Sequence, residues 1–323
     1  MKILVTGATG QLGSAVARAL VARGDDVRCL VRDPQRARGL EVELVGGDVC
    51  QPETLAPAMK GIEAVAHVAG VVSYNPAELA KMRQVNVEGT RAILDAAALA
   101  GVRRVLLTSS IATLGYLEDP LAVGDEETAF NWQGEGIGYF DTKREAEALV
   151  LSDSRLEGLA VNPGITFGAH DVHRNAGRMV FQIAEGGPPA VPCGATTVAT
   201  LDDVVAGHLL ALDRGRRGER YVLGGLNLTF LELYARIAAR MALPAPTRVL
   251  RPWQMMVAAQ LGEWRRSFGG PEPVLTLALA KMSSRNRRYS SAKAERELGW
   301  ISSSFDDGID ACVGWYRAQG YLP

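Results

Sequence analysis

Short apolar runs alternate with longer amphipathic segments along the first half of the chain. The runs are rich in β-branched residues, which predicts strands at Lys2–Thr6, Asp26–Val31, Val42–Val45, Ala64–Val68, Arg104–Thr108 and Leu159–Asn162. Between them, Leu12–Arg23 and Ala77–Ala100 carry apolar residues at helical spacing. Strands that alternate with helices run parallel, and strands covered on both faces are apolar throughout. The pattern therefore predicts an α/β fold with a doubly wound parallel sheet.

The pattern changes after Pro163. Turns rich in glycine and proline follow at 186–189 and 215–218, with only short strands such as Tyr221–Leu223. We therefore divide the chain at about residue 165. Residues 1–165 form the parallel-sheet domain, and residues 166–323 form a smaller, mostly helical portion that sends some elements back to the main sheet.

Composition narrows the class of protein. The 323 residues include 35 Lys plus Arg and 36 Asp plus Glu, so no basic field is available to bind a nucleic acid. His170 and His173 lie three residues apart without a matching cluster of ligands, so no metal site is predicted. The chain begins directly with a strand and has no apolar run of about 18 residues. We therefore expect a soluble cytoplasmic protein.

A glycine-rich turn joins the first strand to the first helix. Residues 6–13 read TGATGQLG, with glycines at Gly7, Gly10 and Gly13. Glycines allow a tight turn and close approach of the backbone to a pyrophosphate, which the helix amino terminus then binds. We predict a dinucleotide-binding domain of the Rossmann type in residues 1–165; the alternative is a purely structural turn.

The end of the second strand bears on which dinucleotide binds. Val31 offers no carboxylate for a ribose hydroxyl, and Arg32 follows it, where an arginine accommodates the 2′-phosphate of NADP. We therefore favour NADP(H) over NAD(H). Arg32 could instead be a solvated side chain, and Asp33 could point inward and reverse this preference. Asp48 and Val49, after the third strand, either contact adenine or form a simple turn.

Three side chains have the chemistry of a carbonyl reductase. Thr108, Ser109 and Ser110 end the fifth strand, and Tyr139 and Lys143 lie four residues apart at the start of a predicted helix, so they share one face. A phenol has a pKa of about 10, and a nearby ammonium lowers it toward neutrality. Tyr139 then serves as acid or base, and Ser110, preferred over Ser109, binds the substrate oxygen. The alternative is a partly exposed helix pair without a function.

Together these motifs resemble those of the extended short-chain dehydrogenase/reductases. The likeness is greatest to the dihydroflavonol-reductase-like branch, which includes bacterial proteins described as sugar epimerases associated with hopanoid synthesis. Beyond the residues above, it rests on LVRDP (30–34), NVEGT (86–90), LTSSIATLG (107–115), NPG (162–164), DDV (202–204) and SSAKAERELGW (290–300). The segment Phe140–Thr142 lacks the basic residue often found inside the tyrosine motif, which weakens the assignment to a branch.

The resemblance implies roles for individual residues. Ser110, Tyr139 and Lys143 form the catalytic triad, and Asn86 supports it from its helix. The resemblance also implies a homodimer formed by the helices at 76–100 and 139–151. The implied cofactor-binding residues are Gly7, Thr9, Gly10, Gln11, Leu12, Arg32, Asp48, Val49, Thr108, Tyr139, Lys143, Pro163 and Ile165.

The second half is expected to determine substrate choice, through segments 114–138, 168–179 and 245–285. In the last of these, Trp253, Met256, Val257, Leu261 and Trp264 recur at helical spacing. We expect this stripe to pack on its own domain or to roof a pocket, and we do not expect membrane association. Three arginines at 285, 287 and 288 either bind a phosphorylated substrate or lie in a solvated loop.

The sequence thus predicts an NADP(H)-dependent oxidoreductase that reduces a small ketone or aldehyde, or oxidises the secondary alcohol, by hydride transfer. A nucleotide-sugar epimerase or dehydratase with retained NAD is the first alternative, because it shares these residues. The second is a non-catalytic dinucleotide sensor. Sensors of this fold commonly lose the tyrosine–lysine pair, and this sequence keeps both Tyr139 and Lys143.

Overall fold

The computed structural model describes residues 1–37, 39–270 and 275–322. Residues 271–274, which belong to the segment 245–285 expected to affect substrate choice, lie outside the described residues.

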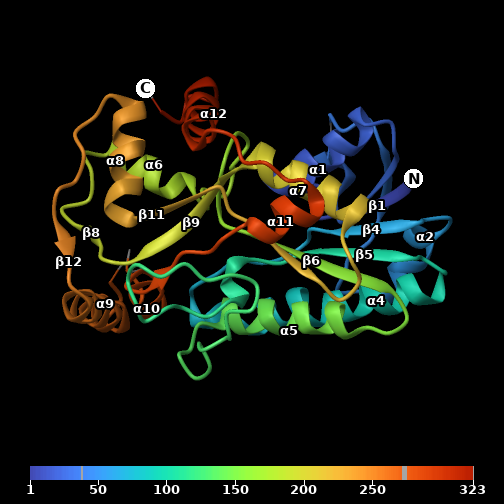
Figure 1. Ribbon diagram of the computed structural model, residues 1–323, viewed down its shortest axis with the longest axis horizontal. Coiled ribbons are helices and arrows are strands. Elements are labelled where there is room, and N and C mark those ends of the chain that lie inside the picture. Colours follow the sequence, from blue (N-terminus) through green and yellow to red (C-terminus); the bar gives the residue numbers. More distant parts are fainter. Residues whose placement is uncertain (38, 271–274, 323) are drawn as a thin grey trace.

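A seven-stranded parallel sheet forms the centre of the molecule (Figure 1). In the order β10-β6-β5-β4-β1-β2-β3, it confirms the predicted doubly wound fold, whose strand order reverses beside β1. Ligands of such sheets bind at the carboxyl ends of the strands near this reversal. The strands are β1 (Lys2–Thr6), β2 (Asp26–Val31), β3 (Glu43–Gly46), β4 (Ala64–His67), β5 (Arg104–Thr108), β6 (Glu157–Pro163) and β10 (Arg220–Leu223).

Helices cover both faces of this sheet because side chains alternate along each strand. Ile3 and Val5 pack with α1 (Gln11–Ala22), α7 (Leu201–Arg214) and α11 (Ala292–Leu298) on one face. Leu4 packs on the other face, among residues of the second set of helices. That set comprises α2 (Leu55–Met59), α4 (Gly89–Leu99) and α5 (Gly138–Ser152).

The helix predicted at 77–100 is present, but it is not a regular α-helix throughout. The chain forms a 3₁₀ turn η3 (Pro76–Glu78), the short helix α3 (Leu79–Met82), a π-helical segment η4 (Arg83–Glu88) and then α4. A π-helical turn widens the helix and often occurs at functional sites. Here it carries the buried side chain of Asn86.

The rest of the chain builds a second, smaller core. Helices α6 (Gly177–Ala184), α8 (Phe230–Met241) and α12 (Phe305–Ala318) contribute apolar side chains to it. It packs against a small sheet of β7 (Ile165–Phe167), β9 (Ala195–Thr200), β11 (Leu226–Thr229) and β13 (Asn286–Arg287). The shorter elements are β8 (Val191–Pro192), β12 (Val249–Leu250), η1 (Pro34–Ala37), η2 (Pro52–Thr54) and η5 (Ile111–Thr113).

Helix α9 (Pro252–Ser267) corrects one expectation from the sequence. The predicted stripe forms a helix, but Trp253, Val257, Leu261 and Trp264 are exposed instead of packed. Met255 and Ala259 face inward, where they pack with α10 (Leu277–Ser283). The face of α9 that carries Met255 and Ala259 packs on α10, so the opposite apolar face points outward. No helix within the described residues is both long and apolar enough to cross a membrane.

Candidate active site

The turn between β1 and α1 leaves no room for side chains at two glycines. Gly7 has a φ of +72°, and a Cβ atom on it would lie 2.7 Å from the backbone nitrogen of Ala69. A Cβ atom on Gly13 would lie 2.2 Å from the carbonyl oxygen of Gly7. Thr9 and Leu12 are half-buried in the same turn. Glycine is therefore required for α1 to begin so close to the end of β1.

The amino terminus of α1 is available to a phosphate. Gly10 occupies the N-cap position, and no side chain within the described residues caps this helix. Its first N–H groups and its dipole therefore suit an anion, which is the fit that a dinucleotide pyrophosphate requires. The side chain of Gln11 is engaged elsewhere, because its Nε2 donates to the carbonyl oxygens of Gly168 and Ala169 at 3.0 and 2.9 Å. Only the backbone of Gln11 is thus left for the phosphate.

The residues after β2 keep the arrangement that favours a 2′-phosphate. Arg32 follows the last residue of β2, and its side chain is exposed. Asp33 accepts a hydrogen bond through Oδ1 from the backbone N–H of Gln35 at 2.9 Å. This carboxylate therefore caps η1.

Asp48 and Val49 lie after β3, as expected, but each has a structural task. Asp48 accepts a hydrogen bond through Oδ1 from the backbone N–H of Cys50 at 2.9 Å. Val49 is buried against Gly89, on which a Cβ atom would lie 2.9 Å from Val49 Cγ2. This contact fixes the edge of the cofactor crevice against α4.

Ser110, Tyr139 and Lys143 lie together at the carboxyl end of β5. Helix α5 begins at Gly138, so Tyr139 and Lys143 occupy successive turns at the start of one helix, as predicted. The hydroxyl of Ser110 lies close enough to the phenol of Tyr139 to lower its pKa. The Nζ of Lys143 donates to the carbonyl oxygen of Thr108 at 2.6 Å. Ser109 points away from Tyr139, toward Glu147, which favours Ser110 as the hydroxyl that meets a substrate.

Burial dominates the protonation of this group. Burial and then the neighbouring Tyr74 raise the pKa of Tyr139, while the Ser110 hydroxyl and the charge of Arg287 oppose them. Burial lowers the pKa of Lys143 to about 8, and Glu147 opposes this shift. The expected lowering of the Tyr139 pKa is therefore not present in the ligand-free protein, because the phenol is shut away from water. Tyr139 is held as a neutral proton donor.

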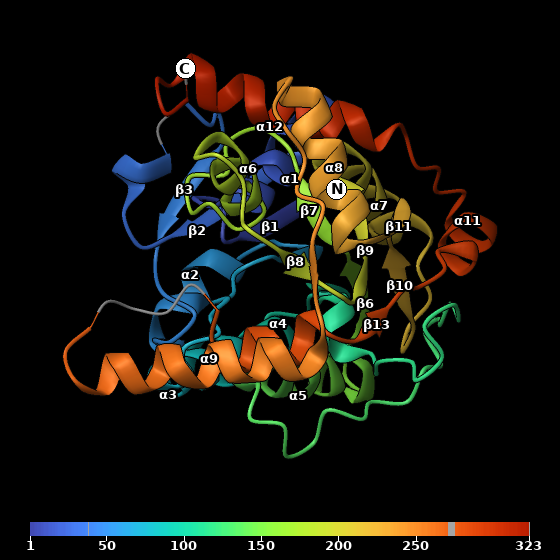
Figure 2. The same ribbon diagram turned by 90° about the vertical axis from the view of Figure 1, so that its left-hand side faces the viewer.

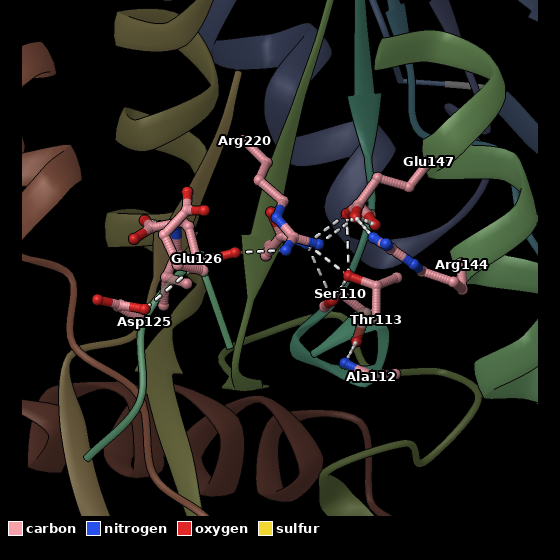
Figure 3. A network of polar contacts seen from close by, with 12 residues as sticks. Ser110, Ala112, Thr113, Asp125, Glu126, Arg144, Glu147 and Arg220 are labelled. Atoms are coloured by element: carbon pink, nitrogen blue, oxygen red, sulfur yellow. Dashed lines mark hydrogen bonds and ion pairs between the residues drawn. The ribbon is translucent and has the colours of Figure 1, made fainter. Parts of the chain in front are cut away.

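Glu147 is a site residue that sequence reasoning missed. It is fully buried one helical turn after Lys143, and its Oε2 accepts from Ser109 Oγ (2.6 Å), Thr113 Oγ1 (2.9 Å) and Asn162 Nδ2 (2.5 Å) (Figure 3). Its Oε1 pairs with the guanidinium groups of Arg220 at 2.8 Å and Arg144 at 3.3 Å. Its spacing from Lys143 in the sequence was the only available signal.

Arg220 extends this network to the loop between η5 and α5. Its Nη2 donates to the carbonyl oxygen of Glu126, and the carboxylate of Glu126 accepts from the backbone N–H of Val222 at 2.7 Å (Figure 3). The network therefore ties α5, β5, β6 and β10 together beneath Ser110. Such a densely hydrogen-bonded charge cluster makes the floor of the site rigid, with Asn162 Oδ1 as its one buried atom that has no partner within the described residues.

Asn86 supports the site from the π-helical segment. Its amide exchanges two hydrogen bonds with the backbone of Val71, at 2.8 and 3.0 Å, and donates to Thr142 Oγ1 at 3.2 Å. The loop after β4 is thus fixed against α5 beside Lys143. The widened π turn is what directs this short side chain between the two segments.

The remaining predicted cofactor residues lie along the same edge. Pro163 ends β6 and is buried, and Ile165 begins β7 and is half-buried. Gly164 between them packs closely, since a Cβ atom on it would lie 2.6 Å from the carbonyl oxygen of Thr197. In the described part of the chain, no three His, Cys, Asp or Glu side chains gather as metal ligands would.

A cluster of apolar side chains, which we call the chamber, surrounds Tyr139. Its lining comes from distant segments: the loop before α5, α3, η5, α5 and α10. The buried members are Met82, Ala112, Trp132, Ile137, Tyr139, Phe140, Ala278 and Met282, and Val71, Tyr74, Tyr116, Phe130 and Leu279 pack around them. The ring centroids of Tyr74 and Tyr139 lie 5.9 Å apart, edge to face. The acid/base candidate therefore lies among mainly apolar and aromatic side chains.

Comparison with known proteins gives consistent results. Residues 3–224 match the model of the NAD dependent epimerase/dehydratase family. The whole chain is 33% identical to the whole of sterol demethylase protein B of Methylococcus capsulatus. It is 30% identical, over 98% of this chain and 95% of the other, to a dihydroflavonol 4-reductase-like protein of Synechocystis sp.. The crystal structure of gox2253 superposes with a TM-score of 0.85 at 36% identity, covering 99% of both chains.

Proposed function

The chain belongs to the NAD-dependent epimerase/dehydratase family of extended short-chain dehydrogenases, and on this premise we propose that it is an NADP(H)-dependent reductase of a ketone or aldehyde. The observation that carries the proposal is the placement of Ser110 beside Tyr139, with Lys143 on the next turn of α5, at the sheet edge that also holds the glycine turn. The similarity to a dihydroflavonol 4-reductase-like protein supports reduction as the chemistry.

In this proposal the nicotinamide, when bound, supplies or accepts the hydride. Tyr139 donates a proton to the developing alkoxide, and Ser110 donates a hydrogen bond to the same oxygen. Lys143 binds the nicotinamide ribose and places positive charge near the phenol. This charge favours proton loss from Tyr139 when the Lys143 ammonium no longer interacts only with the carbonyl oxygen of Thr108. Burial keeps water away from the reacting atoms.

We assign NADP(H) as the preferred cofactor because Arg32 is exposed beside the ribose site while Asp33 is occupied in capping η1. The glycine turn and the free amino terminus of α1 hold the pyrophosphate. Residues 1–165 then bind the cofactor, and residues 166–323 supply most of the substrate side.

Oxidation of NADPH with a panel of aliphatic, aromatic and steroid-like carbonyl compounds tests this proposal. We expect turnover by the wild-type protein and its loss in Tyr139→Phe, which lacks the proton donor. Tyr321→Phe makes the same chemical change at an exposed position and serves as the control. Equal turnover by wild type and Tyr139→Phe would refute the assigned proton donor.

A nucleotide-sugar epimerase or dehydratase is the second candidate, favoured by the description of the matching family. Enzymes of that kind return the hydride to the same substrate molecule and retain NAD through the cycle. Denaturing the purified protein and analysing the released nucleotide separates the two. Stoichiometric NAD or NADH would support the epimerase, and cofactor that exchanges freely would support the reductase.

We also propose a homodimer formed through the segments 76–100 and 139–151, which lie side by side on one face of the sheet (Figure 1). Light scattering coupled to size-exclusion chromatography would measure the mass. A mass of twice 34.5 kDa is expected, and a monomer at micromolar concentration would refute the dimer.

A further inference from the structure

One arginine beside the candidate active site is buried without an acidic partner. Arg287 lies on β13, opposite Thr196 of β9, and is only 3% exposed. Its guanidinium makes a single long hydrogen bond, to Thr196 Oγ1 at 3.5 Å, and its buried Nε has no partner within the described residues. No carboxylate of the described chain lies within ion-pair distance of it. A buried guanidinium in this state is costly, because its lost hydration is not replaced.

Two other partly buried arginines, unlike Arg287, have acidic partners. Arg220 pairs with Glu147 at 2.8 Å, and Arg104 pairs with Glu157 at 2.9 Å. Each also donates to backbone carbonyl oxygens. These two structural arginines thus have both an acidic partner and hydrogen-bond acceptors. The lack of such partners is specific to the site of Arg287.

Arg287 is placed beside the group that meets the substrate. Its Cζ lies 5.6 Å from the ring centroid of Phe140, the residue after Tyr139. Its charge favours ionisation of both Tyr74 and Tyr139 by lowering their pKa values. The unsatisfied guanidinium therefore belongs to the same aromatic chamber as the proton donor.

The neighbouring arginines do not add to this charge. Arg285 stacks on the ring of Tyr116, with 4.4 Å from Cζ to the centroid, and lies near Glu118. Arg288 donates to the carbonyl oxygen of Pro120. A single planar guanidinium matches the single charge and two oxygens of a carboxylate, whereas a dianionic phosphate calls for more positive charge.

We propose that Arg287 binds a carboxylate of the substrate, so that the preferred substrate is an oxo acid whose carbonyl oxygen meets Tyr139 and Ser110. This inference rests on the proposed reductase function for the position of the carbonyl. The proposal decides between the alternatives that the sequence left open for the three arginines. Arg287 binds the ligand, whereas Arg285 and Arg288 contact neighbouring side chains and backbone.

The test uses straight-chain oxohexanoates that differ in the position of the carbonyl, each paired with its methyl ester. For the best acid, we expect kcat/KM to fall about 100-fold in Arg287→Gln, since a desolvated charge pair loses one partner. The ester should change little, and Arg287→Lys should recover part of the activity on the acid. Arg285→Gln, which removes an exposed arginine of the same strand region, is the matched control. Equal use of acid and ester by wild type would overturn the proposal.

Binding to a protein that cannot turn over keeps this inference separate from the reductase proposal. Calorimetric titration of NADP⁺-loaded Tyr139→Phe with the oxo acids should show binding that Tyr139→Phe/Arg287→Gln lacks. If no carbonyl is reduced but this binding is seen, the reductase proposal fails and the carboxylate site stands. If turnover is seen but Arg287→Gln binds the acid normally, the reductase stands and the carboxylate site fails. Tight binding of inorganic phosphate in place of the acid would also overturn it.

A different observation carries a second inference, about the outer face of α9. Trp253, Val257, Leu261, Trp264 and Phe268 lie along this face, each between 51% and 75% exposed. Their spacing of three or four residues places them in one stripe. Figure 2 shows α9 running along the outside of the molecule. A contiguous apolar face of this size marks a contact with a partner or a membrane.

The charges around the stripe identify its partner. Arg248 and Arg251 precede the helix, and Arg265 and Arg266 end it, so the apolar face has exposed cations at both ends. Glu263 is the one acid in α9, and it pairs with Arg266 at 3.1 Å. Tryptophan beside arginine is typical of helices that lie in the headgroup region of a bilayer.

We infer that α9 rests on an anionic membrane surface. It packs on α10, whose Ala278 and Met282 belong to the apolar cluster around Tyr139. Co-flotation with vesicles of phosphatidylcholine containing about one-third phosphatidylglycerol tests this. We expect flotation that Trp253→Ser/Trp264→Ser removes and that the exposed control Ile301→Ser keeps. The inference would be overturned if the protein does not float with the vesicles, or if flotation is unchanged in the double variant. It would also be overturned if the double variant loses self-association and not flotation.

Discussion

The proposed cofactor cradle and the proposed substrate chamber of this protein are built from different parts of the chain. The cradle is one continuous segment, residues 6–13, in which glycine lets the backbone of β1, α1 and Ala69 meet. The chamber consists of side chains from α3, α5, α10, η5 and the loop before α5, which are far apart in the sequence. A backbone cradle tolerates almost no change, whereas a chamber lined by separate segments can be relined without altering the fold. One cofactor-binding fold can therefore serve many substrates.

The rigidity of the cradle predicts the largest effect. Gly13→Ala should abolish cofactor binding, because the added Cβ would lie 2.2 Å from the carbonyl oxygen of Gly7 and push α1 away from β1. Gly46→Ala is the control, since nothing lies within 4 Å of a Cβ there. Fluorescence titration with NADPH measures both. Normal binding by Gly13→Ala would contradict the cradle geometry.

The network beneath the chamber should behave as a structural unit. Glu147→Gln leaves Arg220 without its buried partner, so we expect the free energy of unfolding to fall by about 3–5 kcal/mol. Glu145→Gln, on the same helix, breaks only an exposed pair with Arg83 and should cost less than about 1 kcal/mol. Urea unfolding provides both values, and similar losses in the two variants would show that Glu147 is not the centre of the network.

We expect Lys143 to be required for activity and, at the same time, to lower the free energy of unfolding. Its folded pKa of about 8 lies below the unfolded value, so the cost of burying its charge is fully present below pH 8 and is released as the pH rises toward 10.5. Lys143→Met should therefore gain about 1–3 kcal/mol at pH 7 while losing activity, and the gain should shrink at pH 10. Thermal unfolding at the two pH values checks this. A less stable variant at pH 7 would contradict it.

The smallest effect is expected at the outer edge of the cradle. Arg32→Ala should raise the Kd for NADPH about 10-fold and leave that for NADH nearly unchanged, because only the 2′-phosphate meets this exposed side chain. Direct titration of wild type and variant with both nucleotides gives the ratio. An equal loss for both nucleotides would place Arg32 elsewhere on the cofactor.

The parallel sheet and the glycine turn were predictable because both follow from local patterns. Buried parallel strands read as apolar runs, and the turn needs glycine for steric reasons. The spacing of Tyr139 and Lys143 was readable for the same reason, since one helix face carries both.

Features that depend on distant partners were not predictable. Glu147 meets Arg220, 73 residues further along the chain, and no local signal links them. The periodicity predicted the apolar stripe of α9 but not that the stripe faces outward. Its direction depends on which face of α9 packs on α10, and the local sequence does not determine that. The π-helical break at 83–88 was also hidden, since it is fixed by contacts of Asn86 with Val71 and Thr142.

The most direct test of the central claim, reduction by hydride transfer to an external carbonyl, is isotopic. NADPH carrying deuterium at the transferring position of nicotinamide C4 would be incubated with the best carbonyl compound and the wild-type protein. We expect the alcohol product to contain one deuterium at the former carbonyl carbon, and Tyr139→Phe to form little of it. Conversion of a substrate without deuterium in the released product, with the cofactor still bound, would contradict a reductase and identify an internal hydride return.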